Sequence, residues 1–324
     1  MNYHEILKAI VFCFIIFIFV GFFWIFTQIF SNNLEQFFLW KTAYSNQSLL
    51  ASIINNVSNP EILFPARNWQ IKDLEIDAPS AISVNITDNG SQAKILFEKN
   101  SGKKLPIASL TKLMTAVISI ENYNSSQEVK ISKKAAAQGG LFKAGETFST
   151  DTLVQAMLIG SDNSAAYALS EVMDKEKFVG LMNAMAEKFE LLNTYYSDPV
   201  GSDTNNYSTA EDLAKLTKKL LEDYPLIFQI TTNQEFQVNN LDGTFHHKVI
   251  STNQLLDNSF VDWSNKIVGS KTGTNEEAGE CLILILKASN NKGYLINVIL
   301  NSKDRFTEIK KIIDWTNAAY EWRI

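Results

Sequence analysis

The sequence predicts an α/β (α+β) domain in which strands from its two ends join in one sheet around a central group of helices. Three observations predict this fold class. Strand-like alternation marks the beginning of the domain, helical periodicity dominates its middle, and strand-like runs return near the C-terminus. Neither group of strands can bury both faces alone, so one sheet closing over a helical insert is expected. A chain of 324 residues, 46% of them hydrophobic, is long enough for such a core.

The elements of this domain follow in a regular order along the chain. Two strands come first, at 81–86 and 93–97, and the turn Asp88-Asn89-Gly90 separates them. Helical spacing of apolar residues then predicts three helices, over 110–120, 152–173 and 176–192. The remaining segments are four strands and a closing helix, expected over 235–239, 266–270, 282–288, 295–300 and 306–322.

The N-terminus is expected to anchor the protein in a membrane. Residues 9–30 form an uncharged run of 22 residues, which as a helix spans about 33 Å, enough for one bilayer crossing. A secretory signal peptide would end in a small-residue cleavage site, and none follows this run. We therefore predict four segments, which are a cytoplasmic N-terminus (1–8), a transmembrane anchor (9–30), an extracytoplasmic stalk (31–77) and a catalytic domain (78–324).

Charge and cysteine content exclude several classes of protein. The 29 Lys and Arg residues are outnumbered by 35 Asp and Glu residues, and no basic run exceeds two residues. Such a chain lacks the basic patch that binds nucleic acid. Two cysteines make neither a disulfide framework nor a zinc site, so we expect Cys13 and Cys281 to be unpaired. His246 and His247 are adjacent, unlike facing metal ligands, and no metal site is predicted.

A nucleophile and its base are predicted in the segment Ser109-Leu110-Thr111-Lys112. Residues three apart at the start of a helix lie on one face, so the Ser109 hydroxyl and the Lys112 amine can meet. A lysine can take the serine proton if burial or a neighbouring cation keeps it uncharged. The same spacing occurs elsewhere in the chain, but only Ser109 opens a strongly apolar helix shortly after a proline.

Two further motifs supply the groups that a serine nucleophile and its lysine base need, and Ser161-Asp162-Asn163 is the first of them. In Ser161-Asp162-Asn163 the Ser161 hydroxyl can pass a proton to a leaving amine, and the Asn163 amide can bond both Lys112 and a substrate carbonyl.

The last motif is Lys271-Thr272-Gly273, which occurs once in the chain and ends a strand-like run. Lys271 can bind a substrate carboxylate and help to hold Lys112 neutral, and Thr272 can add a hydroxyl donor. Gly273 lets an extended substrate approach the strand.

Together the three motifs resemble the signature of penicillin-binding proteins and class A β-lactamases. Their surroundings are similar to those of the serine D-alanyl-D-alanine carboxypeptidases of low molecular mass. This likeness extends from about Ala78 to the C-terminus, and the stretches that carry it are 106–115, 161–166, 198–201, 207–214, 252–256 and 271–282.

The resemblance implies a penicillin-binding, β-lactamase-like fold, with an antiparallel sheet flanked by helices and a helical subdomain beside the cleft. It also implies an enzyme that trims peptidoglycan stem peptides ending in D-Ala-D-Ala through a Ser109 acyl-enzyme, with β-lactams as covalent inhibitors and no metal or organic cofactor. The substrate lies in the cell wall, so we expect a single-pass protein of the bacterial cell membrane with its catalytic domain outside.

The same resemblance implies a role for each site residue. Lys112 is the base, Ser161 passes the proton and Asn163 orients the substrate. The terminal carboxylate is held by Lys271 and Thr272, beside Gly273, and the oxyanion hole is formed by the backbone N–H groups of Ser109 and Thr274. Thr274 stands where the family usually has a larger residue and Asn275 where it usually has Thr, so substrate preference here is open.

Several activities remain open at this point. Removal of a terminal D-alanine, cleavage of a cross-link by a DD-endopeptidase, and transfer to another amine all share one acyl-enzyme. A class A-like β-lactamase would need a water-activating glutamate, for which Glu235 has suitable spacing to Asn239 but lies close before Lys271 in a strand-like stretch. An inactive peptidoglycan-binding protein is the last alternative, and intact Ser109 and Lys112 argue against it.

Overall fold

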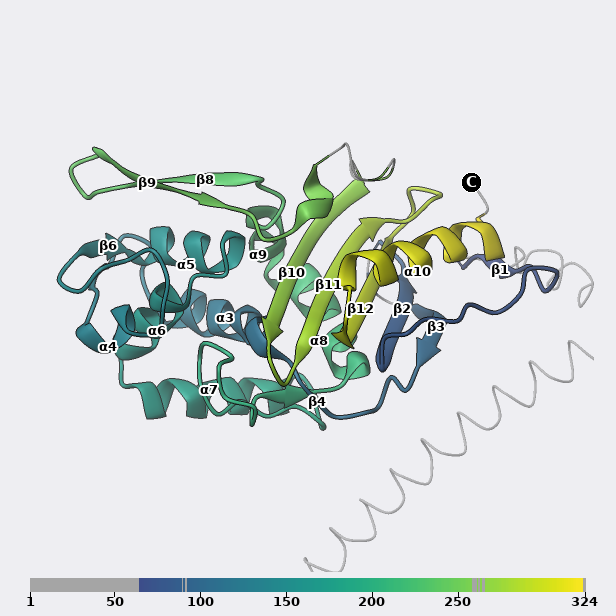
Figure 1. Ribbon diagram of the computed structural model, residues 1–324, viewed down its shortest axis with the longest axis horizontal. Helices are drawn as coiled ribbons and strands as arrows, with labels where there is room; N and C mark the ends of the chain where they lie inside the picture. Colours follow the sequence, from purple (N-terminus) through teal and green to yellow (C-terminus); the bar gives the residue numbers. More distant parts are fainter. Residues whose placement is uncertain are drawn as a thin grey trace, which may run out of the picture. The chain divides into compact units, whose positions relative to one another are not determined.

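Strands from both ends of the described chain form one five-stranded antiparallel sheet in the computed structural model, as the sequence predicts (Figure 1). These strands are β2 (Ser80–Ile86), β3 (Ala93–Lys99), β10 (Ile267–Asn275), β11 (Gly279–Lys287) and β12 (Tyr294–Ser302). Their order is β10-β11-β12-β2-β3, so β10 and β3 are the edges. The runs of Leu, Ile and Val in β11 and β12 suit the centre of the sheet, where both faces are buried.

The structure describes residues 64–322 except 89, 91, 258–260, 262, 264 and 265. The predicted N-terminus (1–8), anchor (9–30) and first part of the stalk (31–63) lie outside the described residues. Within the described ranges, every helix is too short or too polar to cross a membrane.

The predicted stalk ends earlier than expected, because residues 64–77 belong to the same compact unit as the sheet, Phe64–Ile324. Strand β1 (Ala66–Arg67) pairs with β13 (Tyr320–Glu321). The backbone N–H of Asp77 donates to Glu308 Oε2 at 2.7 Å. This segment is therefore bound to the C-terminal end of the domain.

Two helices cover the two faces of the sheet. Helix α10 (Arg305–Ala319) crosses one face in Figure 1, and α8 (Ala210–Asp223) packs on the other against β2 and β12. Side chains of β11 alternate between them. Leu282 and Leu284 belong to the core under α10, whereas Ile283 and Ile285 belong to the core on the α8 side. Because successive side chains of a strand point to opposite faces, each face of the sheet has its own apolar layer.

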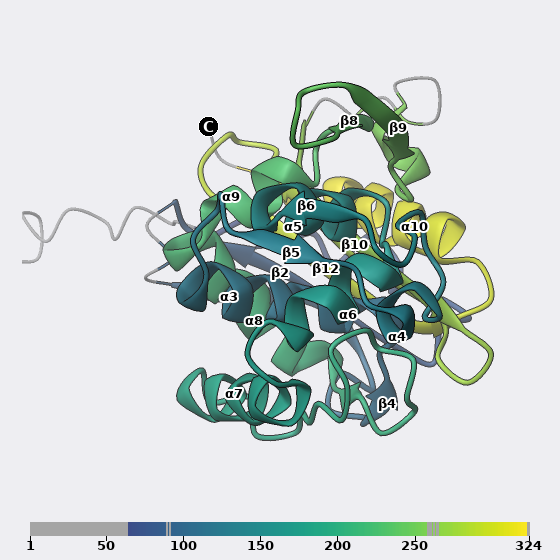
Figure 2. The same cartoon turned by 90° about the vertical axis from the view of Figure 1, so that its left-hand side faces the viewer.

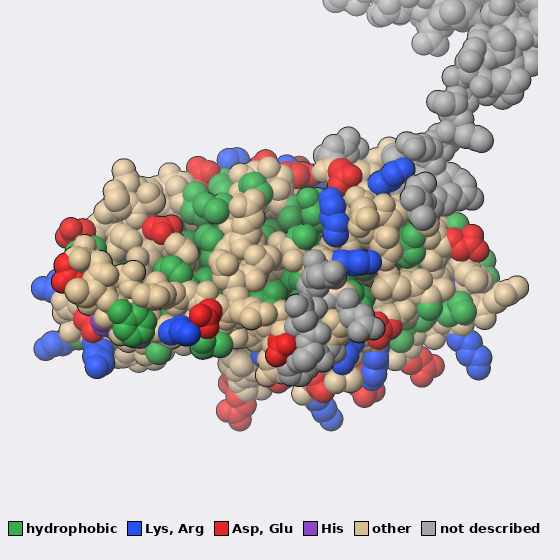
Figure 3. All heavy atoms as spheres, turned by 90° about the horizontal axis from the view of Figure 1, so that it is seen from above, with side chains coloured by type: hydrophobic (Ala, Val, Ile, Leu, Met, Phe, Trp, Pro, Cys, Tyr) green, Lys and Arg blue, Asp and Glu red, His purple; other side chains and the backbone are tan. Residues whose placement is uncertain are grey.

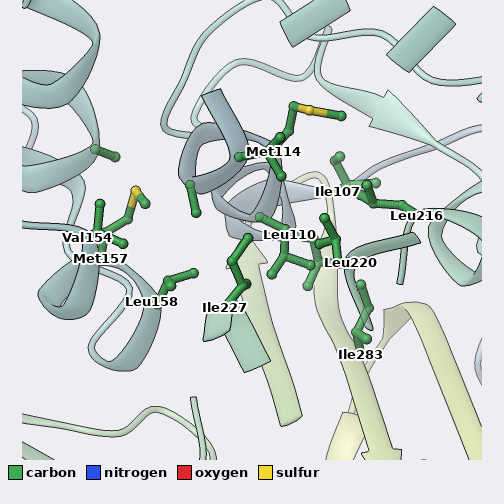
Figure 4. Close-up of a cluster of buried hydrophobic side chains, with 14 of the residues drawn as sticks. Ile107, Leu110, Met114, Val154, Met157, Leu158, Leu216, Leu220, Ile227 and Ile283 are labelled. Atoms are coloured by element: carbon green, nitrogen blue, oxygen red, sulfur yellow. The ribbon is translucent and has the colours of Figure 1, made fainter. Parts of the chain in front are cut away.

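A helical subdomain gathers at the β10 side of the sheet (Figures 1 and 2). Its elements are η1 (Ala108–Thr111), α3 (Lys112–Asn122), α4 (Lys133–Ala136), α5 (Thr150–Ile159), α6 (Asn163–Glu171), α7 (Lys175–Lys188) and α9 (Pro225–Ile230). Helix α3 is buried on all sides from Lys112 to Ser119, as expected for the central helix of a core. Figure 4 shows Leu110 within a cluster to which α5 contributes Met157 and α8 contributes Leu216.

The single helix predicted over 152–173 is wrong, because the chain breaks between α5 and α6. Ser161 has a φ of 60°, a left-handed conformation that cannot continue a helix. The Asp162 side chain then accepts from the N–H of Ala165 and caps α6. This break turns the second predicted motif into a loop.

Short antiparallel pairs complete the domain. They are β4 (Leu105–Pro106) with β7 (Tyr207–Ser208), β5 (Glu128–Lys130) with β6 (Thr147–Ser149), and β8 (Glu235–Asn239) with β9 (Phe245–Ile250), and the helical turn η2 (Gln254–Leu256) follows β9. Strand β8 of the β8–β9 hairpin has the bounds predicted for the strand over 235–239. His246 in β9 lies 3.0 Å from Glu146 and joins the hairpin to the helical subdomain. Among the described residues, no three metal-ligating side chains come together.

The surface carries both signs of charge. Seen from the side of the β8–β9 hairpin, acidic and basic side chains are interspersed and apolar ones lie between them (Figure 3). Cys281 is buried in β11 and unpaired, which confirms the expectation for this residue, and Cys13 lies outside the described residues.

Candidate active site

The predicted nucleophile and base lie side by side at the start of α3. Ser109 lies in the turn η1, Lys112 is the first residue of α3, and the Lys112 Nζ is 2.8 Å from the Ser109 Oγ. The helical part begins at Ala108, slightly before the predicted 110–120, and Pro106 pairs in β4. Ala108 has a φ of 45°, so the nucleophile follows a strained backbone position of the kind found at active sites.

Lys112 is buried among acceptors. Its side chain has no solvent exposure, and its Nζ also lies 2.8 Å from Asn163 Oδ1 and 2.7 Å from the backbone oxygen of Val200. Burial lowers the pKa of Lys112 to about 7, against the opposing effect of the Asp198 and Asp162 carboxylates. At neutral pH a substantial fraction of this amine is therefore uncharged.

The three partners of Lys112 suit a base. Carbonyl oxygens can only accept hydrogen bonds, so Asn163 and Val200 take the two N–H bonds of a neutral amine. The lone pair of the nitrogen is then left for the third partner, Ser109, whose hydroxyl can donate. The geometry thus orients the uncharged lysine to take the proton of the serine.

The Ser161-Asp162-Asn163 motif is the loop between α5 and α6, next to Lys112. The Asn163 Nδ2 donates to the backbone oxygen of Gln138 at 3.2 Å, which leaves its second amide N–H for a ligand. The predicted contact of Asn163 with Lys112 is confirmed. Asp162 points away from this pair and binds the N–H of Leu141 at 2.6 Å.

The Lys271-Thr272-Gly273 motif lies inside β10, not at its end as predicted. The strand continues because pairing with β11 extends as far as Asn275 opposite Gly279. The Lys271 Nζ lies 2.9 Å from Ser161 Oγ and 2.9 Å from the Thr272 backbone oxygen. Burial lowers the pKa of Lys271 well below its usual value, and the neighbouring positive charges add to this effect.

Gly273 lies against the turn that carries the nucleophile. A Cβ at this position would be 2.9 Å from the Ile107 oxygen, closer than real Cβ atoms come, and 3.1 Å from the Ser109 nitrogen, a tight contact. The glycine therefore admits the Ser109 turn to the edge of the sheet, a role that sequence reasoning assigned to the approach of the substrate. Thr274, the next residue on this edge strand, is exposed.

Three neighbours of the predicted residues were given no role from the sequence, although Val200 and Thr252 lie in the stretches 198–201 and 252–256 that carry the resemblance. Val200 acts through its backbone oxygen, so its side chain carries no signal. Thr252 bonds Thr272 through the two hydroxyl groups. Arg305 donates from Nη1 to the Gly273 oxygen at 3.0 Å and brings a positive charge to the end of β10. Arg305 could have been noticed, because arginine occurs only three times in the sequence.

The three predicted motifs thus meet at the junction of β10 and the helical subdomain. Ser109, Lys112 and Asn163 are joined through one amine, and Ser161 is joined to Lys271. A hydroxyl with a buried amine of lowered pKa can perform nucleophilic acyl transfer.

Comparison with known proteins gives a consistent result. A family model described as D-alanyl-D-alanine carboxypeptidase (peptidase S11) matches residues 67–304. The chain is 31% identical to the D-alanyl-D-alanine carboxypeptidase DacF of Bacillus subtilis, over 85% of this chain and 71% of that protein. It is 32% identical to the carboxypeptidase DacC of Escherichia coli, over 71% of this chain and 60% of that protein. A D-alanyl-D-alanine endopeptidase of Pseudomonas aeruginosa is 31% identical, over 69% and 72% respectively.

Solved structures share the fold. A D-alanyl-D-alanine carboxypeptidase from Mycobacterium tuberculosis matches with a TM-score of 0.67 at 18% identity, over 78% of this chain and 95% of that chain. A cysteine mutant of the Streptomyces K15 DD-transpeptidase matches with a TM-score of 0.66 at 25% identity, over 76% and 100%. These matches confirm the predicted mixed α/β fold with its antiparallel sheet.

Proposed function

The chain belongs to the peptidase S11 family, the D-alanyl-D-alanine carboxypeptidases, and from this premise we propose that it removes the last D-alanine of peptidoglycan stem peptides through an acyl-enzyme on Ser109. One observation carries the proposal. The buried Lys112 amine, with a pKa of about 7, lies 2.8 Å from the Ser109 Oγ. Its other two hydrogen bonds go to carbonyl oxygens, those of the Asn163 side chain and the Val200 backbone.

Acylation begins when Ser109 Oγ attacks the carbonyl carbon of the penultimate D-alanine and Lys112 takes its proton. The backbone N–H groups of Ser109 and Thr274 stabilise the oxyanion, since Gly273 holds the serine turn against the strand that carries Thr274. The proton then passes through Ser161 to the leaving nitrogen, and the C–N bond breaks. Water later attacks the ester, and Lys112 again serves as the base.

The substrate is held by groups on both sides of the nucleophile. The free amide N–H of Asn163 binds the acyl carbonyl of the peptide. Lys271 and Thr272 bind the terminal carboxylate, and this anion favours the positively charged form of Lys271, which burial disfavours by lowering its pKa. The Arg305 guanidinium adds a second positive charge at this end of β10.

A penicillin fits the same chemistry, because its lactam carbonyl can acylate Ser109. The glutamate whose spacing suits the water-activating base of a β-lactamase is Glu235. Glu235 lies in the β8–β9 hairpin, where it pairs with Lys248 at 3.0 Å. We therefore expect the adduct to persist.

The experiment that tests the proposal is intact-protein mass spectrometry over time after benzylpenicillin is added to a protein lacking its first 33 residues. The expected result is a lasting adduct on the wild type and none on Ser109→Ala. Ser126→Ala, which removes an exposed hydroxyl, is the matched control and should react normally. Drug consumption without an adduct would mean a β-lactamase, and unreacted drug would mean a binding-only domain.

The location follows from the substrate. We place residues 9–30 in the bacterial cell membrane and the catalytic domain outside it, where peptidoglycan is found. Protease added to intact spheroplasts should then digest the domain. Survival of the domain, with digestion only after lysis, would contradict this orientation.

A further inference from the structure

The backbone oxygen of Val200, one of the three partners of Lys112, lies on a loop. This loop is residues 197–206, which lie between α7 and β7 and belong to no helix or strand. The ends of the loop are held together, since the backbones of Tyr195 and Tyr207 exchange hydrogen bonds of 2.9 and 3.1 Å. A loop oxygen can be a fixed partner of the base only if the loop is also bound to the turn that carries the nucleophile.

The 197–206 loop packs directly on the nucleophile turn and the start of α3. Thr115 Oγ1 donates to the backbone oxygen of Pro199 at 2.6 Å. Gly201 has a φ of 87°, and a Cβ at this position would come within 2.0 Å of the Ala108 oxygen. The backbone of the loop therefore contacts the residue that precedes the nucleophile, at a distance that only glycine permits.

Asn206, the last residue of the loop, joins the loop to the nucleophile turn. It has no solvent exposure. Its Nδ2 donates to Thr111 Oγ1 at 3.0 Å and to the backbone oxygen of Asp198 at 2.9 Å. Thr111 lies in η1 next to Lys112, and Asp198 lies two residues before Val200. One amide nitrogen thus bonds both the turn of the nucleophile and the part of the loop that carries the carbonyl oxygen.

The oxygen of the same amide bonds the start of the loop. Asn206 Oδ1 accepts from the Ser197 nitrogen at 2.6 Å, the Ser197 hydroxyl at 2.7 Å and the Asp198 nitrogen at 3.0 Å. The backbone oxygen of Asn206 accepts from the N–H of Ile107, just before η1, at 3.1 Å. A carboxamide is a neutral side chain that donates two hydrogen bonds and accepts others at once. A residue of similar size without an amide therefore cannot make this set of bonds.

Asp198 also shapes the loop, but its charge gives it a second effect. Its Oδ1 accepts from the N–H groups of Val200 and Gly201 at 2.6 and 2.7 Å. Burial lowers the pKa of Lys112, and the Asp198 carboxylate opposes this effect. Removal of Asp198 would therefore change the charge of the base as well as its position. Asn206 is uncharged, so a change there tests position separately.

We propose that Asn206 is a positioning residue for acylation. It fixes the Val200 oxygen relative to the nucleophile turn, and this oxygen aims the Lys112 lone pair at the serine. The inference rests on the proposed function and names a residue that supports its base from a distance. A neutral amine has one lone pair, which stays directed at the serine while both N–H bonds have fixed acceptors. If the Val200 oxygen moves away, the amine can rotate, and fewer molecules have the lone pair in line with the serine hydroxyl.

The test measures acylation of the full chain, purified in detergent, by benzylpenicillin. Stopped flow at about pH 9, where Lys112 is mostly neutral, gives the dissociation constant of the initial complex and the rate constant of acylation at saturating drug. Asn206→Ala should lower the rate constant at least about tenfold and change the dissociation constant less than about threefold. Intact-protein mass spectrometry should still show the adduct on all molecules. A partly unfolded protein would instead show fewer modified molecules that react at the wild-type rate constant.

Thr111→Val is a milder second variant. It removes the bond that Asn206 makes to the nucleophile turn and keeps the bonds within the loop. It should lower the acylation rate constant by about threefold, the effect of one hydrogen bond. Combined with Asn206→Ala it should cause no further loss, since both changes break the same connection. If Asn206→Ala does not fold, a wild-type rate constant in Thr111→Val overturns the inference.

The matched control is Asn297→Ala, which changes another fully buried asparagine. Asn297 lies in β12, where its Oδ1 accepts from Ser83 Oγ at 2.8 Å and its Nδ2 donates to the backbone oxygens of Leu284 and Leu295, both at 3.3 Å. These bonds stabilise the middle of the sheet rather than the nucleophile turn. The variant should lose stability in urea as Asn206→Ala does, but it should acylate with the wild-type rate constant.

The outcomes separate this inference from the proposed function. A wild type that forms the Ser109 adduct, together with an unchanged rate constant in Asn206→Ala, overturns the positioning role alone. An equal fall of the rate constant in Asn297→Ala overturns it too, because the effect would then follow from lost stability. Absence of an adduct on the wild type overturns the proposed function itself.

Discussion

The Lys271 Nζ lies 2.9 Å from the Ser161 Oγ, although the two residues are 110 positions apart in the chain. Lys271 is part of β10, at the edge of the sheet, and Ser161 is part of the loop between two helices. This bond therefore joins the sheet to the helical subdomain at the site itself. It orients a hydroxyl that would otherwise be free to rotate, so the lysine positions Ser161 even before a substrate carboxylate arrives.

Replacing Lys271 with alanine should impair substrates that carry a terminal carboxylate. The loss of a buried, hydrogen-bonded charge is expected to cost about 3 kcal/mol, on the order of a hundredfold in kcat/KM. A peptide amidated at its C-terminus has no charge to bind, so it should lose much less, namely only what Lys271 contributes by orienting Ser161. The rates on the two peptides are measured by the release of D-alanine or D-alaninamide. Lys134→Ala, which changes an exposed lysine, is the control. An equal loss on the two peptides would contradict carboxylate binding by Lys271.

The rate of acylation should rise with pH through about 7. Below its pKa of about 7 Lys112 is protonated and cannot take the Ser109 proton, and above it the amine is neutral. The rate constant for benzylpenicillin, measured from pH 5 to 9, should increase about tenfold per unit at the acid end and then reach a plateau. Lys112→Arg, which stays protonated throughout, should be slower by about 10² to 10⁴. A wild-type rate independent of pH would refute the role of Lys112 as base.

The sequence predicted those parts of the site that act through side chains in local motifs. Ser109 and Lys112 meet because they are three residues apart in one turn, which spacing alone can reveal. The closure of one sheet around the helices followed from the order of elements, and the helical subdomain beside the cleft followed from the family resemblance. Val200 could not be predicted in the same way, because its contribution is a backbone oxygen placed by tertiary structure.

The misjudged boundaries have local causes. The predicted helix over 152–173 ran across Gly160, which interrupts the apolar run, because the left-handed backbone of Ser161 leaves no mark in a pattern of apolar residues. Strand β10 was ended too early, because Lys271-Thr272-Gly273 looks polar and turn-like in isolation. Pairing with β11 overrides that preference.

Gly273→Ala should reduce acylation more than it reduces stability. Its Cβ would press on the Ile107 oxygen and the Ser109 nitrogen, and backbone atoms cannot move away as a flexible side chain would. We expect acylation to fall at least tenfold, with a loss of about 1–3 kcal/mol in the free energy of unfolding. Stopped-flow acylation and urea denaturation measure the two effects. Gly102→Ala, where a Cβ meets nothing within 4 Å, is the control, and wild-type kinetics in Gly273→Ala would contradict the close approach.

Arg67 connects the segment 64–77 to helix α10 near the C-terminus of the domain. Its guanidinium donates to the Ala319 backbone oxygen at 3.2 Å and to the Ile71 oxygen at 2.7 Å. It also lies 4.9 Å from the centre of the Trp315 ring, a cation–π contact. The ion pair with Asp73 at 3.1 Å involves an 87% exposed carboxylate and adds little.

Arg67→Met should therefore destabilise the protein while leaving acylation intact. Methionine keeps much of the apolar contact but removes the hydrogen bonds to the two carbonyl oxygens and the cation–π contact with Trp315, so the free energy of unfolding should fall by about 1–3 kcal/mol. Urea denaturation of the Arg67→Met protein measures this loss. Lys72→Met, which removes an exposed cation from the same segment, should change it by less than about 0.5 kcal/mol. If the two variants were equally stable, residues 64–77 would be a linker as the sequence predicted. A difference between them would instead show that the segment contributes to the stability of the catalytic domain.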